Sequence, residues 1–133
     1  AQSVTGVCLH GAISEAASHF HAFDAVVMPS RFEGLALVSI EASLAGVPVI
    51  ASRVAGLVET LPEDWPLFFD LCDADTFILA IAQIIERKVV AKELGAHARL
   101  FASTRFSMEH MIADYKGIYT DLDRMVESDT SCP

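Results

Sequence analysis

The sequence predicts an α/β fold, a Rossmann-like parallel sheet with flanking helices. Short apolar runs alternate with helical patterns over residues 4–70, which is typical of βαβ units. The runs are apolar at successive positions, as in strands that are covered on both faces. With 133 residues, 53% of them hydrophobic, the chain has the size of one folded domain.

The first half is expected to hold four strands and the elements that join them. The strands are expected at 4–9, 25–29, 47–52 and 67–70. Ser14 and Glu15 suggest the first turn of a helix that runs to His21. Residues 35–46 are expected to form a second helix, which Gly46 ends. RVAGLVET then predicts a short helical turn, and LPEDWP predicts a loop.

The second half is expected to be helical. The patterns predict helices over residues 73–88, 91–104 and 107–125, the last with a stripe of methionines and tyrosines interpreted as core. No linker divides the chain, so residues 1–126 are expected to form a single, partial domain. Residues 127–133 are expected to be a flexible tail.

Composition limits the partners. Acids outnumber bases 18 to 9, a net charge of −9, which argues against nucleic acid because such modules show a basic face. Helix N-termini can still hold a phosphate without net positive charge. The three cysteines show no metal spacing and fit a reducing cytosol. No run approaches the roughly 20 apolar residues of a membrane span. A cytoplasmic location is therefore expected, with the inner face of the membrane as a further place.

Ligands of parallel sheets bind outside the carboxyl ends of the strands. Four loops are expected at that edge because each follows a predicted strand. They are His10-Gly11, Pro29–Gly34, Ser52–Gly56 and Asp70–Asp73.

The stretch PSRFEGLALVSIE contains two acids eight positions apart, Glu33 and Glu41. The helix over 35–46 is otherwise apolar or small, so it is expected to be largely covered, and a buried carboxylate needs a partner or a ligand. Amides at the helix start attract an anion such as a diphosphate, and carboxylates accept hydrogen bonds from hydroxyls. The amides in question are those of Gly34, Leu35, Ala36 and Leu37.

Along the chain, an acid is followed by the amides and then by a second acid. This order matches a ligand with sugar hydroxyls, a diphosphate and ribose hydroxyls. A simpler interpretation stays open. In it, Glu33 caps the helix or lies in solvent, and Glu41 pairs with Arg31 or Arg53.

PSRFEGLALVSIEASLAGVPVIAS resembles the signature of retaining GT-B glycosyltransferases of family 4, the "glycosyl transferases group 1" type. Their C-terminal, donor-binding domain carries two glutamates separated by seven residues, within a frame that reads PS…EG…EA…G.PVI. The segments HGAISEAASHFHAFDAVVMPS, VAGLVETL and RFSMEHMIADYKGIYTDL extend the similarity. It covers roughly residues 4–122.

The resemblance implies transfer of a sugar from a nucleotide-sugar with retention of configuration, as in polysaccharide biosynthesis. It implies no metal and no cofactor besides the donor substrate. Glu33 is similar to the catalytic glutamate that contacts the sugar, and Glu41 to the one that holds the ribose. The implied substrate-binding set also contains Ser30, Arg31, Gly34, Leu35, Ala36 and Leu37.

The chain also departs from this family. Ala36 and Ala55 stand where glycine is usual, and Glu63–Pro66 replaces a glycine-rich turn. The first strands of the domain, with their phosphate-neutralising cations, and the acceptor-binding N-terminal domain have no counterpart. The isolated chain is therefore expected to be inactive until that domain or a partner chain completes it.

The predicted strand at 4–9 is left without its usual neighbours. It is expected to pair with 25–29, with a second chain, or not at all. An unpaired edge of this kind favours homo-oligomers.

Two other classes of protein stay open. One is a non-catalytic interaction or regulatory fragment derived from a transferase. The other is a flavodoxin-like or receiver-like domain, for which HGAISEA offers neither a phosphate loop nor an acidic cluster. Trp65 fits either a shield for a nucleotide base or a cover of the core, and a structural role is favoured for His10.

Overall fold

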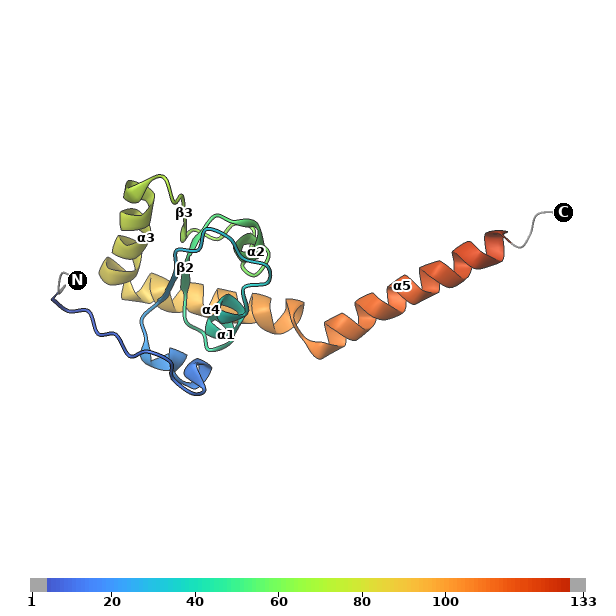
Figure 1. The fold of residues 1–133 in the computed structure, drawn as a ribbon, viewed down its shortest axis with the longest axis horizontal. Helices are drawn as coiled ribbons and strands as arrows, with labels where there is room; N and C mark the ends of the chain where they lie inside the picture. Colours follow the sequence, from blue (N-terminus) through green and yellow to red (C-terminus); the bar gives the residue numbers. More distant parts are fainter. Residues whose placement is uncertain (1–4, 130–133) are drawn as a thin grey trace.

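The computed structural model describes residues 5–129 and confirms a Rossmann-like parallel sheet with flanking helices. Within these residues β1 (Val26–Met28), β2 (Val49–Ser52) and β3 (Phe68–Phe69) form one sheet in the order β1-β2-β3. Figure 1 labels β2 and β3. All pairs are parallel, with Val26 opposite Val49 and Ala51 opposite Phe68. The other elements are η1 (Ala16–Ala22), α1 (Leu37–Leu44), α2 (Ala55–Val58), α3 (Ala74–Glu86), α4 (Lys88–Arg105) and α5 (Met108–Asp129).

β2 lies at the centre of the core. All four of its residues are buried, and it pairs with a strand on each side. α1 packs on β1 and β2 and against α4, while α3 packs on β2 and β3. The continuous apolar run VPVIAS therefore corresponds to a strand covered on both faces, as expected for a parallel sheet.

Trp65 belongs to this core. Its side chain is 2% exposed, and its indole Nε1–H donates to the carbonyl of Val49 at 2.8 Å. A buried tryptophan needs such an acceptor. Of the two roles considered for Trp65, the structure supports the cover of the core and not a shield for a base.

α1 ends at the predicted glycine. Gly46 has a φ of 77°, and its N–H donates to the Ser43 carbonyl while that of Val47 donates to Ala42. This is a Schellman cap, in which a left-handed residue favours glycine. Gly95 of α4 lies against it, because a Cβ on Gly95 would clash with the Gly46 carbonyl group. α4 thus crosses the end of α1 with backbone against backbone.

The predicted strand at 4–9 is not formed in residues 5–9, which are turn and loop, while residue 4 lies outside the described part. Gly6 has a φ of 86°, and Leu9 is 92% exposed. A lone strand cannot satisfy its backbone groups, and no neighbouring strand is available for this segment among residues 5–129. The helix expected from Ser14 is instead the 3₁₀ helix η1, with Glu15 at its N-cap.

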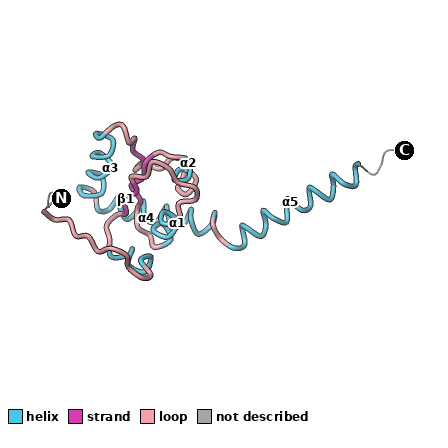
Figure 2. Tube along the Cα trace, viewed as in Figure 1, coloured by secondary structure: helices cyan, strands magenta, loops and turns pink. Residues whose placement is uncertain are grey.

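The C-terminal half is helical as predicted, but the last helix is more exposed and longer than expected. Asp73 caps α3 by accepting from the Asp75 amide at 3.0 Å. α5 includes residues 127–129 of the expected flexible tail, and residues 130–133 are outside the described range. Figure 2 shows α5 running away from the rest of the molecule.

The apolar stripe of α5 was interpreted as core, and this is wrong. Its side chains are 44–65% exposed, and no helix or strand among the described residues packs extensively along it. They are Met108, Met111, Ile112, Tyr115, Ile118, Tyr119 and Leu122.

Ser43 offers a test of the packing beneath α1. Its hydroxyl is buried and has no hydrogen-bond partner among residues 5–129, a cost that alanine would remove. Ser43→Ala should therefore raise the free energy of unfolding by about 1 kcal/mol in chemical denaturation. Ser39→Ala, the control, should lower it by about 1 kcal/mol, because the buried hydrogen bond between Thr60 Oγ1 and Ser39 Oγ at 3.0 Å would be lost. A loss of stability in Ser43→Ala would contradict this description.

Candidate functional site

Three of the four loops expected at the carboxyl edge follow the strands there. Pro29–Gly34 follows β1, Ser52–Gly56 covers the end of β2 and the start of α2, and Asp70–Asp73 follows β3. His10-Gly11 follows no strand, so its expected place at this edge is wrong.

Hydrogen bonds connect β2 to Glu33 through Ser30. The buried Ser52 hydroxyl donates to the Ser30 carbonyl at 2.5 Å and lies 3.3 Å from the Met28 carbonyl. Ser30 Oγ donates to Glu33 Oε1 at 2.6 Å. The Glu33 side chain is therefore neither a helix cap nor free in solvent, because a hydroxyl holds one of its oxygens.

Gly56 of α2 fixes the loop from the other side. A Cβ at this position would lie 2.5 Å from the Glu33 carbonyl oxygen and would also clash with that of Gly34. No side chain fits in such a contact. Gly56 is the second residue of the Ala55-Gly56 pair, so the glycine that packing requires is retained and Ala55 lies exposed.

The start of α1 presents unpaired amides. Across the described residues, no acceptor is found for the amides of Gly34, Leu35 and Ala36, whereas Leu37 donates to the Leu35 carbonyl at 2.9 Å. The N-cap, Ala36, provides no side-chain cap. Ala36 as a whole residue is 2% exposed and belongs to the core, so its methyl group is packed inside the protein.

Glu41 is exposed, which corrects the expectation of a covered helix. It lies on the outward face of α1 with Leu37, Val38 and Leu44, which are 43–60% exposed. That face is uncovered because the neighbours of α1 are η1, α4 and the strands. Within residues 5–129 the carboxylate has no ion pair with Arg31 or Arg53, and the Arg53 guanidinium lies 4.7 Å from the centre of the Phe68 ring.

No group of three or more histidine, cysteine or acidic side chains in the described part of the chain could hold a metal ion. None of the helices there has the length and apolar character needed to cross a bilayer.

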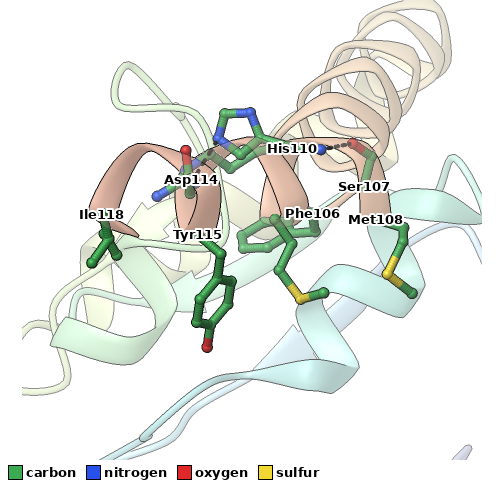
Figure 3. A pocket seen from close by; sticks show the side chains of 9 residues that line it. Phe106, Ser107, Met108, His110, Asp114, Tyr115 and Ile118 are labelled. Carbon is green, nitrogen blue, oxygen red and sulfur yellow. Dashed lines mark hydrogen bonds and ion pairs between the residues drawn. The ribbon is translucent and has the colours of Figure 1, made fainter. Parts of the chain in front are cut away.

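A hollow of about 360 Å³ lies at the elbow between α4 and α5, apart from the predicted site (Figure 3). Ser107 caps α5 by accepting from the His110 amide at 3.0 Å. Asp114 lies 3.7 Å from Arg105 of α4 and 3.5 Å from His110. These contacts link α4 to α5, and Phe106, Met111, Tyr115 and Ile118 line the hollow.

Comparisons with known proteins agree with the sequence motif. Residues 1–87 match the model of the family described as glycosyl transferases group 1. The chain is 31% identical over 118 residues to D-inositol 3-phosphate glycosyltransferase of Corynebacterium urealyticum, covering 85% of this chain and 27% of that protein. It is 29% identical over 114 residues to the O-antigen biosynthesis glycosyltransferase WclY of Escherichia coli, covering 86% and 31%.

A solved structure shows the same architecture. Sucrose-phosphate synthase from Thermosynechococcus elongatus, a GT-B protein, superposes with a TM-score of 0.68 at 31% identity. The match covers 80% of this chain and 27% of that one. The chain therefore spans less than a third of the length of these relatives.

The sequence placed Ser52 and Gly56 at the ends of a loop expected at the candidate site, but it assigned neither residue a role there. Ser52 is the polar last residue of the apolar run VPVIAS, and Gly56 lies at the start of a helical turn. Ser52 is a weak signal in the sequence, because a serine at the end of a strand is common. Only the fold shows that both residues contact the Glu33 loop.

Gly56→Ala tests the close contact with that loop. We expect the free energy of unfolding to fall by about 2 kcal/mol, because backbone must move to admit the methyl group. The control is Gly117→Ala, at an exposed helical position with no atom near the added Cβ, where stability should rise by about 1 kcal/mol. Equal effects of the two substitutions in denaturant titrations would exclude the contact.

Proposed function

Because the chain belongs to the group 1 family of glycosyl transferases, we propose that it forms the donor-binding part of a retaining GT-B enzyme that uses a nucleotide-sugar. The main support for this proposal is the loop 30–36. In it the carboxylate of Glu33, which is oriented by a hydrogen bond, directly precedes three unpaired amides. Amides at a helix start bind phosphate oxygens well. The carboxylate beside them suits sugar hydroxyls.

Each group has a chemical task in this proposal. Ser30 occupies Glu33 Oε1, so Oε2 accepts from the sugar and stabilises positive charge that develops on it. The amides of Gly34, Leu35 and Ala36, with the N-terminal end of α1, stabilise negative charge on the leaving diphosphate. No metal ion or cofactor is needed for these two roles.

Glu41 is proposed to hold the nucleotide ribose. Its carboxylate is exposed and has no partner among residues 5–129, so both oxygens can accept from vicinal hydroxyls. Leu37 and Val38 flank it on the same outward face of α1. A ligand lying there would exclude water and strengthen the hydrogen bonds.

We propose that residues 5–129 supply only part of the positive charge at this site. Arg53 lies over Phe68, while Arg31 in the loop is exposed and is the cation we assign to the diphosphate. The acceptor-binding domain, or a partner chain, is proposed to supply the rest. The exposed stripe of α5 offers a surface for it, because apolar patches of this kind mark interfaces. Asp114, which is linked to Arg105 and His110, holds the base of α5 in place.

The alternative is a non-catalytic interaction module derived from a transferase. The same stripe of α5 favours it, since that surface suits a protein partner whether or not a sugar is bound. The two proposals differ in whether the loop 30–36 binds a ligand.

Nucleotide binding separates them. We expect calorimetry with UDP, GDP, ADP and their glucose or mannose conjugates to detect binding of one nucleotide class. Glu41→Gln should weaken it about tenfold to a hundredfold, as for a lost hydrogen bond to a charged group. Glu86→Gln, at the exposed end of α3, is the matched control and should leave the affinity unchanged. Absence of binding at roughly millimolar ligand would favour the non-catalytic module.

Sugar transfer tests the need for the acceptor-binding domain. We expect no transfer by these 133 residues alone, because they span less than a third of the length of the relatives and the acceptor wall is proposed to lie in the other domain. Addition of the N-terminal part of the Corynebacterium urealyticum relative should restore it. Ile118→Glu on the stripe should prevent this restoration, while Thr120→Glu on the opposite face of α5 should not. Turnover of a nucleotide-sugar by the chain alone would contradict the prediction.

A further inference from the structure

We propose that Ser52 and Ser30 are positioning residues that set the orientation of the Glu33 carboxylate. The geometry concerns this chain alone, and only the purpose of that orientation rests on the proposed function. Glu33 would be the group that touches the sugar, and the two serines would act through it.

Ser52 anchors the loop at its origin. It is fully buried at the end of β2, where its hydroxyl reaches the carbonyls of Met28 and Ser30. Met28 is the last residue of β1 that pairs with β2, whereas the Ser30 carbonyl lies beyond the strand and has no partner on a neighbouring strand. A buried carbonyl without a donor is costly, so the path of the backbone from 28 to 30 follows the Ser52 hydroxyl.

Ser30 connects the backbone that Ser52 holds to the carboxylate of Glu33. Its carbonyl is held by Ser52, and its hydroxyl donates to Glu33 Oε1 at 2.6 Å. A short hydrogen bond to an ionised oxygen is strong, and both side chains are half-buried. One carboxylate oxygen is therefore occupied from within the loop, and the second is left for a ligand.

Gly56 limits the other direction of movement. Its contact with the carbonyls of Glu33 and Gly34 prevents the loop from sinking toward α2. The loop is therefore held by hydrogen bonds at its start and by backbone contact behind Glu33. Such preorganisation is what a charge-stabilising group requires.

The chain provides a matched control for a merely structural role. Ser39 of α1 is also fully buried and pairs with Thr60 Oγ1 at 3.0 Å. This pair joins α1 to the end of α2 without a hydrogen bond to the loop. Ser39→Ala thus removes a buried hydroxyl bond but leaves the Glu33 carboxylate in place.

Calorimetry should measure the sugar increment, the ratio of the dissociation constants for a free nucleoside diphosphate and its sugar conjugate. UDP with UDP-glucose, GDP with GDP-mannose and ADP with ADP-glucose are the probes. Ser30→Ala and Ser52→Ala should lower the increment about tenfold, with affinity for the free diphosphate within about twofold of wild type. Ser39→Ala should leave the increment unchanged, and Ser30→Thr, which keeps the hydroxyl, should restore it.

A double-mutant cycle distinguishes positioning from general loss of stability. In a Glu33→Gln background, Ser30→Ala and Ser52→Ala should have no further effect on the increment. The proposal would be overturned if either serine substitution still changed the increment in that background. It would also be overturned if Ser30→Ala and Ser52→Ala alone gave the same increment as Ser39→Ala. If Ser52→Ala does not fold, Ser52→Cys keeps the volume with a weaker donor and should lower the increment in the same direction.

A measurement without ligand separates this inference from the proposed function. The carbon-13 resonance of the Glu33 carboxyl group should shift in Ser30→Ala and Ser52→Ala and stay in place in Ser39→Ala. If wild type binds none of the probes and the resonance still shifts, the proposed function fails and the positioning role stands. If the probes bind and the resonance does not move, the positioning role fails by itself.

Discussion

Complete burial of β2 is the constraint on which the rest of the structure depends. It is the strand with a partner on both sides in the described sheet, and each wall of the candidate site is attached to it. Ser52 holds the end of β1, Trp65 is bonded to Val49, and the Arg53 amide donates to the Phe69 carbonyl at 2.9 Å. A local change in β2 would therefore shift residues at the ends of all three strands.

Much of this fold could be predicted from the sequence because its signals are local. Apolar runs mark β1 and β2, Gly46 marks the end of α1, and Asp73 marks the start of α3. The motif places Glu33 and Glu41 around a helix start for the same reason. The contacts of Ser52 and Gly56 join segments far apart in the chain, so composition and spacing carry almost no record of them.

The three main errors of the sequence-based predictions have one physical form. The segment 5–9, the outward face of α1 around Glu41 and the stripe of α5 are largely apolar, and all three lie exposed. An apolar pattern predicts that a surface is covered, but it does not say by what. The chain spans less than a third of the relatives described above, and no element among residues 5–129 covers these surfaces.

The contact of Gly95 with Gly46 has a mechanical consequence. Where side chains separate two helices, rotamer changes absorb small displacements, but here backbone meets backbone. Gly46 closes the helix that carries Glu41. A displacement of α4 at this contact must therefore move the backbone at the end of α1, because no side chain lies between the two helices to absorb it.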